Sequence, residues 1–376
     1  MKSTLVFFTS SRADYGKIKE VIKKIKKIKY KIIVTGSHLL KEYGYTVDHI
    51  KKDFPLKNLI VFSNQKFNDS GKYIFEKTTI GLNKILKRYK FDLAIIHGDR
   101  VETLAAASTF MLNRIKIAHI EGGELSGTVD EMIRHSVSKL ANVHFVTNKI
   151  AKKVLINSGE KKENIFITGS PDIDILKSQK RPNIKEVKKR YKIPFDKYAI
   201  SFLHPVTTEG FQKNNINSKI YFKTLKSCNA VNFIQFVPNN DDFSKIILKN
   251  LKTNLKNCKN VKILPSMRFE FYLTLLENSK FIIGNSSSAI MEAPYFGIPS
   301  INVGSRQINR FGEQLSTNID FSNKNILKSI KNIKIKKSKK RKTIFGVGKS
   351  SDKIIKIINS KKFKKINLQK SYKNLI

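Results

Sequence analysis

The sequence lacks the features that mark several special classes of protein. Its 376 residues include no tryptophan and only two cysteines, Cys228 and Cys258. Two cysteines without metal-ligand spacing build neither a disulfide framework nor a zinc site, and they suit a reducing compartment. The apolar run near the N-terminus has about five residues, which is too short for a secretory signal or a membrane span. We therefore expect a cytoplasmic protein with no membrane partner.

Acidic residues are also scarce, with 29 Asp and Glu against 73 Lys and Arg, and the formal net charge is +44. Most of the excess is lysine in segments of helical spacing, such as residues 23–31, where it would cover solvated helix faces. The alternative is attraction to polyanions or anionic substrates, from which a diphosphate would benefit modestly. Signatures of helix-turn-helix, zinc-finger and RNA-recognition proteins are absent, so nucleic acid is not an expected partner.

Short apolar runs alternate with longer segments of helical spacing. The runs of the first half predict strands at residues 4–9, 31–35, 59–62, 93–97, 116–120, 143–147 and 164–168. A second series predicts strands at residues 198–203, 231–237, 261–264, 281–283 and 300–303. Apolar runs of this length are typical of parallel strands buried on both faces. The pattern predicts an α/β protein with two Rossmann-type, doubly wound parallel-sheet domains and an interdomain cleft.

The same pattern sets approximate domain ranges. We expect a first domain over residues 1–180 and a second over 195–350, joined by a polar stretch that contains Pro182 and Pro194. A C-terminal helix within residues 351–376 would cross back onto the first domain. In doubly wound sheets, ligands bind at the carboxyl ends of the strands near a topological switch point. The residues directly after each strand are therefore the candidate site residues.

Two arginines follow expected strands of the first domain. Arg12 lies in the stretch SSRADYG, before a helix, where a phosphate could bind the helix N-terminus, although simple capping by Ser or Asp is an alternative. The dinucleotide fingerprint Gly-x-Gly-x-x-Gly is absent there. Arg100 follows Asp99 in the stretch HGDR after the fourth expected strand, and the alternative is a capping Asp with a surface Arg.

Three carboxylates of the first domain are expected in one crevice. They belong to Asp99, to Glu121 in the stretch EGGE, and to Asp130 at the start of a helix. Clustered carboxylates raise one another's pKa, as general acid–base catalysis requires, so we expect raised pKa values here. The alternative is a surface ion pair between Asp130 and Arg134, four residues apart on one helical face, which contributes little.

The second domain carries a set of groups suited to a nucleoside diphosphate. His204 follows its first expected strand in HPVTTE, and Asn239 follows the second, where turn formation is an equal contender. The stretch GNSSSAIMEA presents serine hydroxyls and backbone N–H groups to an anion, and its glutamate suits ribose hydroxyls. The alternative is a capped helix with a surface Glu. The residues of this set are Ser286, Ser287, Glu292 and Arg306.

Taken together, these motifs resemble the hydrolysing UDP-N-acetylglucosamine 2-epimerases of bacterial sialic-acid and legionaminic-acid synthesis. The resemblance rests on SSRADYG, HGDR, HIEGGELSGTVDEMIRH, GSPDID, HPVTTE and GNSSSAIMEAPYFGIPSINVGSRQ, in that order along the chain. It implies a GT-B-like fold, no metal and no cofactor. It implies that a base removes the C2 proton, UDP departs to leave a 2-acetamidoglucal, and water then adds to release a C2-inverted sugar.

The resemblance also assigns residues and an assembly. Asp99, Glu121 and Asp130 match the essential carboxylates of the family, and His204 matches its active-site histidine. Nucleotide-contacting positions are matched by Arg12, Arg100, Asn239, Ser286, Ser287, Glu292 and Arg306. The resemblance suggests a homodimer or homotetramer that binds a UDP-sugar. Ser10 stands where some relatives have Gly, so the backbone approach to the ligand would differ there.

Three alternatives stay open from the sequence. The same chemistry could act on UDP-2,4-diacetamido-2,4,6-trideoxyglucose, for legionaminic acid, and the loops at residues 35–44 and 63–71 are where the C4 and C6 substituents would be distinguished. A GT-B glycosyltransferase would use the same fold with an acceptor. A non-catalytic protein that binds nucleotide sugars or polyanions would rest on charge alone.

Overall fold

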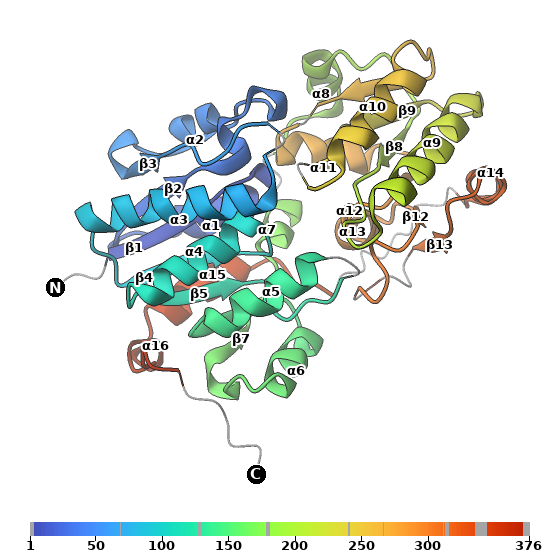
Figure 1. The fold of residues 1–376 in the computed structure, drawn as a ribbon. Coiled ribbons are helices and arrows are strands. Elements are labelled where there is room, and N and C mark those ends of the chain that lie inside the picture. The colour runs from blue at the N-terminus through green and yellow to red at the C-terminus, as the bar shows by residue number, and fades with distance from the viewer. Residues whose placement is uncertain are drawn as a thin grey trace. The chain divides into compact units, whose positions relative to one another are not determined.

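The computed structural model describes residues 4–67, 69–126, 129–177, 181–239, 241–265, 267–310, 312, 316–334 and 344–370. The chain divides into two compact units (Figure 1). Unit 1 consists of Met1–Leu125, Asp130–Lys177 and Phe345–Ile376, and unit 2 consists of Ser126–Val129 and Ser178–Ile344. Each unit has its own parallel sheet, so the prediction of two Rossmann-type α/β domains is confirmed.

Within the described residues, unit 1 has a seven-stranded sheet in the order β3-β2-β1-β4-β5-β6-β7, and its neighbouring strands pair in parallel. The strands are β1 (Thr4–Thr9), β2 (Lys29–Val34), β3 (Leu59–Val61), β4 (Leu93–His97), β5 (Lys116–Ile120), β6 (Val143–Val146) and β7 (Ile165–Ile167). The helices are α1 (Arg12–Lys23), α2 (Val47–Asp53), α3 (Gly71–Arg88), α4 (Val101–Leu112), α5 (Val129–Leu140), α6 (Lys149–Asn157), α7 (Pro171–Lys177), α15 (Ser350–Ile358) and α16 (Lys361–Lys364). The strand order reverses between β1 and β4, which is the switch point of this sheet.

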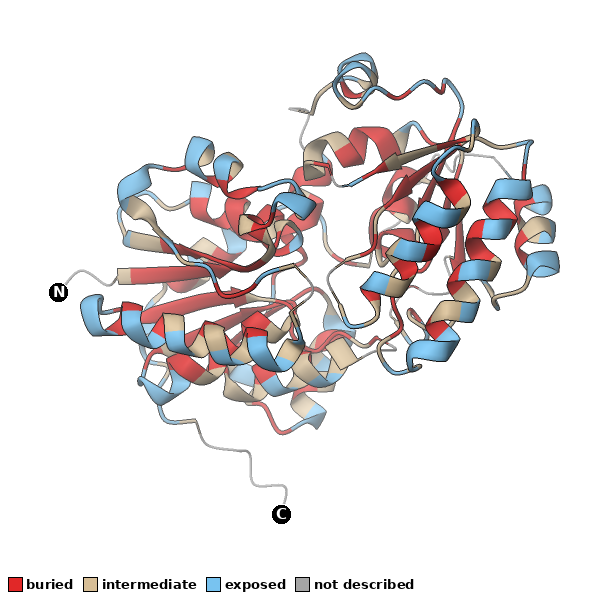
Figure 2. Ribbon diagram, turned by 45° about the horizontal axis from the view of Figure 1, so that its top comes forward, coloured by how far each residue is buried: buried red, intermediate tan, exposed pale blue. Residues whose placement is uncertain are grey.

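The side chains of β1 alternate between two apolar cores, one on each face of the sheet. Leu5 and Phe7 pack in the core that α1 and α15 complete, whereas Val6 and Phe8 pack in the core that α3, α4 and α5 complete. Successive side chains of a strand point to opposite faces, so a strand covered on both faces needs a continuous apolar run. Figure 2 shows the strands and the inner faces of these helices as buried.

The C-terminal segment belongs to unit 1, where α15 and α16 add apolar side chains to the core that contains β1. The backbone N–H of Ser350 donates to the Asp174 carboxylate in α7 at 2.8 Å. In place of the one helix expected within residues 351–376, the described part forms two short helices. The Ser360 side chain caps the second of them. Residues 371–376 lie outside the described residues.

Within the described residues, unit 2 has a six-stranded sheet in the order β10-β9-β8-β11-β12-β13, also parallel. The strands are β8 (Ala199–Phe202), β9 (Phe233–Phe236), β10 (Val261–Leu264), β11 (Ile282–Gly284), β12 (Ser300–Val303) and β13 (Thr317–Ile319). The helices are α8 (Ile184–Tyr191), α9 (Phe211–Ser227), α10 (Ser244–Leu255), α11 (Phe269–Glu277), α12 (Ser288–Met291), α13 (Ala293–Phe296) and α14 (Asn323–Asn332). Its switch point lies between β8 and β11.

Unit 2 differs from the sequence pattern in two places. Strand β13 was not expected, because its three residues are polar or only partly buried and give no apolar run. Unit 2 also takes in the stretch before residue 195, which packs on α11. Arg181 pairs with Glu277 at 2.8 Å, and the Thr274 hydroxyl donates to the Pro182 carbonyl at 2.8 Å.

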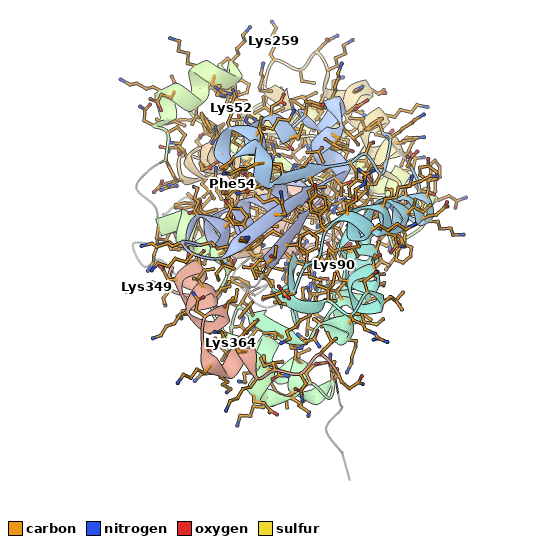
Figure 3. All side chains as sticks on the ribbon, turned by 90° about the vertical axis from the view of Figure 1, so that its left-hand side faces the viewer. Lys52, Phe54, Lys90, Lys259, Lys349 and Lys364 are labelled. Carbon is orange, nitrogen blue, oxygen red and sulfur yellow. The ribbon has the colours of Figure 1, made fainter. Side chains whose placement is uncertain are left out.

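Many lysines stand on exposed surfaces, as their spacing on helices indicated. Figure 3 labels five of them, and all five are exposed: Lys52, Lys90, Lys259, Lys349 and Lys364. In the part of the chain that the structure describes, no helix combines the length and the apolar character needed to cross a membrane.

Candidate active site

The switch point of the unit 1 sheet carries two arginines and an aspartate. Arg12 begins α1 three residues after the end of β1, and Asp99 and Arg100 lie between β4 and α4. The pKa of the buried His38 falls to about 4. Burial is the largest cause, Asp14 opposes it, and the charges of Arg12 and Arg100 add to it. Both guanidinium groups therefore act on His38, so this edge of the sheet carries positive charge.

Asp14 holds the loop before Arg12 in one conformation. Its carboxylate accepts from the backbone N–H of Ser10 at 3.0 Å and of Ser11 at 3.1 Å, and the Ser11 hydroxyl accepts in turn from the N–H of Asp14. This is a capping box at the start of α1. The capping alternative was thus correct for Ser11 and Asp14, and the cap orients the residue that follows it.

Glu121 is the centre of a buried ionic cluster at the carboxyl end of β5. Its Oε2 accepts from Nζ of Lys17 at 2.6 Å and from Nε2 of His97 at 3.0 Å. Its Oε1 accepts from the hydroxyl of Ser170, and Lys17 also pairs with Asp172 at 3.1 Å. Glu121 has a φ of 65°, a backbone conformation that costs a non-glycine residue about 1–3 kcal/mol and clusters at functional sites.

The expectation of raised carboxylate pKa values was wrong for Glu121. Burial raises the pKa of this carboxyl, but the charges and hydrogen bonds of Lys17 and His97 outweigh burial and hold it well below its ordinary range. The expectation considered only neighbouring carboxylates, whereas the nearest charged partner is a lysine. Glu121 is therefore an ionised carboxylate at neutral pH.

Arg134 connects α5 to the loop after β4. It is buried, its Nη2 forms an ion pair with Oδ2 of Asp99, and its Nη1 donates to the Glu124 carbonyl at 2.8 Å. Burial lowers the pKa of Arg134, but the charges of Asp99, Glu124 and Asp130 outweigh it and raise the pKa. The interpretation of Arg134 as half of an exposed ion pair was thus wrong. Asp130 still acts on the same arginine, so Asp99 and Asp130 share one charged network around Arg134.

Sequence reasoning did not select Lys17, His97, Ser170 and Arg134 as site residues. Lys17 was hidden among the many lysines, although it follows the SSRADYG stretch directly. His97 and Ser170 lay within the motifs HGDR and GSPDID, and their position at the ends of β4 and β7 was the available signal. The roles of Lys17, His97 and Ser170 depend on contacts with Glu121, which is distant in the chain from each of them. The role of Arg134 depends on its ion pair with Asp99.

His204 lies after β8 at the switch point of unit 2, locked to the loop after β11. The Asn285 side chain accepts from the His204 N–H at 2.7 Å and donates to the His204 carbonyl at 2.8 Å. The backbone N–H of Asn239 donates to Nδ1 of His204 at 3.1 Å, so the proton of the neutral ring is on Nε2. Burial and then the charge of Arg306 lower the pKa of His204 to about 3, and they outweigh an opposing effect of the Asn239 side chain. His204 is a neutral hydrogen-bond donor through Nε2.

The remaining nucleotide-binding candidates lie at the same edge of the unit 2 sheet. Arg306 donates to the Asn285 carbonyl at 3.3 Å, and the Asn239 amide nitrogen donates to Asp241. Oδ1 of Asn239 is buried, and no partner for it is found among the described residues. A ligand donor would satisfy that atom.

The serine loop and Glu292 complete this edge. Ser286 and Ser287 stand between β11 and α12, and the Ser286 hydroxyl accepts from the N–H of Ser288 at 3.3 Å. Glu292 is buried, so the alternative of a surface glutamate was wrong. It stands at a break between α12 and α13 and adds to the effect of burial in raising the pKa of Tyr272. In the described ranges, no cluster of three or more His, Cys, Asp or Glu side chains could hold a metal ion.

Two Rossmann-type units with polar groups at both switch points define a GT-B-like α/β enzyme fold. The chain belongs to the UDP-N-acetylglucosamine 2-epimerase family, whose sequence model matches residues 20–359. It is 40% identical to the UDP-N-acetylglucosamine 2-epimerase of Neisseria meningitidis serogroup B, over 87% of this chain and 86% of that protein. It is 32% identical to the UDP-N,N'-diacetylbacillosamine 2-epimerase (hydrolyzing) of Legionella pneumophila, over 95% of each chain.

A solved structure supports the same fold. The Methanocaldococcus jannaschii UDP-GlcNAc 2-epimerase, in complex with UDP-GlcNAc and UDP, superposes with a TM-score of 0.76 and 21% identity. The match covers 95% of this chain and 99% of the other.

Proposed function

We propose that this protein is a hydrolysing 2-epimerase that converts UDP-N-acetylglucosamine to N-acetylmannosamine and UDP through a 2-acetamidoglucal, in nonulosonic (sialic) acid biosynthesis. Family membership supports epimerase chemistry over the glycosyltransferase alternative. The name of the Legionella relative supports the hydrolysing branch, and so does the stretch EGGELSGTVDEMIRH. On the same basis we propose a cytoplasmic homodimer or homotetramer, which light scattering on the purified protein would test.

The observation that carries the proposal is the ionised Glu121 between Lys17 and His97. The ion pair of Asp99 and Arg134 belongs to the same unit. The C2 proton of an acetamido sugar is a weak acid, so its removal needs a positioned base that is unprotonated at neutral pH. The pKa of Glu121 meets that second condition. Asp99, Glu121 and Asp130 are the catalytic carboxylates of this proposal.

The proposed reaction has two balanced steps. A carboxylate takes the C2 proton, the C2–H electron pair forms the C1=C2 bond, and the C1–O bond breaks with its electrons leaving on UDP. Water then adds across C1=C2, placing its hydroxyl on C1 and a proton on C2 from the opposite face.

Positive charge and hydrogen-bond donors would stabilise the leaving diphosphate. Arg12, Arg100 and Arg306, the serine loop at Ser286 and Ser287, and Nε2–H of His204 are the groups proposed for this. The buried oxygens of Asn239 and Glu292 suit the nucleoside part, because both accept hydrogen bonds.

A second candidate substrate is UDP-2,4-diacetamido-2,4,6-trideoxyglucose, with the same chemistry for legionaminic acid. It is favoured by the Legionella relative, whose name specifies UDP-N,N'-diacetylbacillosamine. The Neisseria relative is more similar in sequence and is named for UDP-N-acetylglucosamine, which is why the proposal takes that substrate first.

Proton NMR in D2O tests the proposal directly. The purified protein is incubated separately with each of the two nucleotide sugars. Release of UDP together with a C2-deuterated, manno-configured free sugar is the expected result, and the substrate that reacts identifies the pathway. Accumulation of a UDP-linked manno sugar instead would contradict the hydrolysing branch.

The matched controls use two carboxylates of unit 1. Glu121→Gln should abolish turnover of the reacting substrate. Asp48→Asn should leave turnover unchanged, because Asp48 is a half-exposed residue of α2 whose contact is a surface pair with Lys51. Equal activity in both variants would remove Glu121 from the catalytic set.

A further inference from the structure

The loops after β1, β2 and β3 are interlocked at the carboxyl edge of the unit 1 sheet. Oδ1 of Asn64, in the loop after β3, accepts from the Gly36 N–H at 2.9 Å. The Ser37 hydroxyl donates to the Ser10 carbonyl at 3.1 Å. A Cβ on Gly36 would lie 2.3 Å from that carbonyl oxygen, so only glycine permits this approach. The loop after β3 is thus tied to the loop that precedes Arg12.

The same loop also approaches the start of α4. It leads into α3, and a Cβ placed on Gly71 at the start of α3 would lie 3.6 Å from Cγ2 of Val101. Val101 is the first residue of α4 and follows Arg100 directly. Asn64 and Gly71 therefore both lie near the edge of the sheet that carries Arg12, Asp99 and Arg100.

Two neighbouring amides in this loop are buried, but they differ in their partners. Asn64 is fully engaged, because its Nδ2 donates to the Thr78 hydroxyl at 2.7 Å in addition to the contact with Gly36. Gln65 is 4% exposed, yet neither its Nε2 nor its Oε1 has a hydrogen-bond partner among the described residues. Among the Asn and Gln side chains of the described residues, Gln65 alone has both amide atoms buried in this state.

Such a group is costly to keep. A buried amide without hydrogen bonds destabilises a protein, and native structures hold few such groups. An apolar side chain of similar shape would avoid that cost at Gln65. The cost is removed when a ligand with one donor and one acceptor binds, because a carboxamide offers both an acceptor and donors.

We propose that Gln65 is a specificity residue whose carboxamide pairs with an acetamido group of the substrate sugar. The acetamido carbonyl would accept from Nε2, and a hydroxyl of the same sugar would donate to Oε1, because the N–H and C=O of a trans amide point in opposite directions. Both unpartnered atoms are then satisfied by one sugar. This role rests on the proposed function for its substrate class. Gln65 is not among the carboxylates and arginines assigned to the site above.

Isothermal titration calorimetry tests the proposal through binding. UDP, UDP-glucose and UDP-N-acetylglucosamine are titrated into proteins that all carry Asp130→Asn to slow turnover. With Gln65 present, UDP-N-acetylglucosamine should bind about 10- to 100-fold more tightly than UDP-glucose, because UDP-glucose leaves the buried Nε2 without the acetamido acceptor. With Gln65→Leu that preference should disappear while UDP affinity stays the same. Gln212→Leu, at an exposed position of α9, is the matched control and should keep the preference.

Several outcomes would overturn the role of Gln65. They are no preference for the acetamido sugar with Gln65 present, a preference that survives Gln65→Leu, or equal weakening of all three ligands, which indicates a distorted loop. Because the measurement is binding, it is separate from the NMR assay. Selective binding without turnover would defeat the proposed reaction and leave the role of Gln65 standing.

Discussion

Nζ of Lys17 lies 2.6 Å from Oε2 of Glu121, although the two residues are 104 positions apart in the chain. Lys17 comes from α1 and Glu121 from the turn after β5, and both side chains are almost completely buried. A buried carboxylate beside an ammonium group stays ionised, so this pair sets the charge state of the candidate base.

Replacing Lys17 by Met should raise the pKa of Glu121, because burial then opposes ionisation with less compensation from a positive charge. The acid limb of the kcat/KM profile should move to higher pH, and kcat should fall by about 10²-fold, as when one electrostatic stabiliser is lost. Lys17→Arg should restore part of the activity. The exposed Lys52→Met is the control. An unchanged acid limb in Lys17→Met would show that Glu121 does not titrate in catalysis.

The buried histidines of unit 1 should make its stability depend on pH. Burial lowers the pKa of His38 to about 4 and of His119 to about 3, from an ordinary 6.5. Since the folded state disfavours their protonation, the stability they contribute is complete above pH 6.5 and is lost as pH falls toward those values. Between pH 7.5 and 5.5 the loss is about 1.4 kcal/mol for each histidine. Urea titrations followed by circular dichroism at both pH values measure it.

Substituting His119 checks the source of this dependence. Nε2 of His119 donates to the Gly98 carbonyl at 2.9 Å, and Nδ1 of the neutral ring accepts from the Ser138 hydroxyl at 3.0 Å, so His119→Gln should lower stability at pH 7.5. The same variant should show a smaller difference between the two pH values than the wild type. A dependence of undiminished size would place the titrating groups elsewhere.

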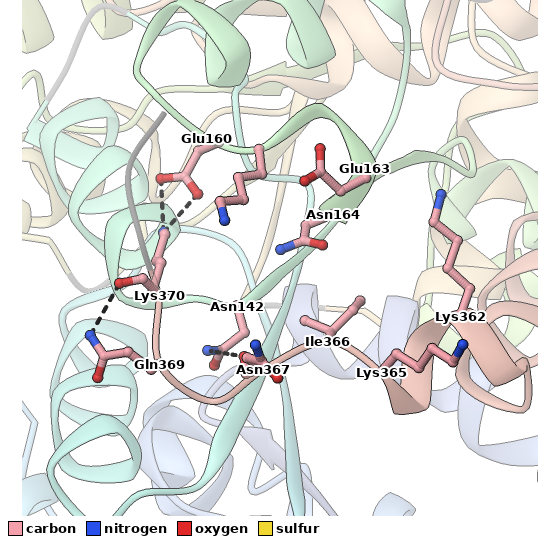
Figure 4. Close-up of a pocket in the computed structure, with 11 residues that line it drawn as sticks. Asn142, Glu160, Glu163, Asn164, Lys362, Lys365, Ile366, Asn367, Gln369 and Lys370 are labelled. Carbon is pink, nitrogen blue, oxygen red and sulfur yellow. Dashed lines mark hydrogen bonds and ion pairs between the residues drawn. The ribbon is translucent and has the colours of Figure 1, made fainter. Parts of the chain in front are cut away.

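Lys370 should stabilise the C-terminal end of α5. Its Nζ donates to the carbonyls of Ser138, Lys139 and Ala141 at 3.1, 2.7 and 2.9 Å, and it pairs with Glu160 at 2.7 Å. Figure 4 shows this pair in a cavity of about 290 Å³ that α16 and the segment after it line. Lys370→Met removes a cation from a helix C-terminus and a partner from a buried carboxylate. It should therefore lower the free energy of unfolding by about 1–3 kcal/mol.

Chemical denaturation of unit 1 would measure that loss, with Lys365→Met as the matched control. Lys365 lines the same cavity but is exposed, so its substitution should leave stability within about 0.5 kcal/mol of the wild type. Equal effects of the two substitutions would mean that only the net charge of the cavity matters.

Local patterns were enough to predict most of the fold. Each interior strand has an apolar run between turn residues, and the predicted strands at 93–97 and 116–120 coincide with β4 and β5. Strand β13 escaped prediction because it is held by pairing with β12 rather than by apolar side chains of its own. The break between α15 and α16 lies in a segment whose spacing is helical throughout, so only the Ser360 cap marks it.

The sequence by itself determined which residues follow the strands, because apolar runs and turn residues are local properties of the chain. That is why Arg12, Asp99 and His204 could be selected without a structure. Only the tertiary structure decided the charge states and partners of the site. The low pKa of Glu121 depends on burial and on a lysine that no local pattern connects to it. Electrostatic interactions depend on distance in space and on exclusion of water, and both arise only when the sheet assembles.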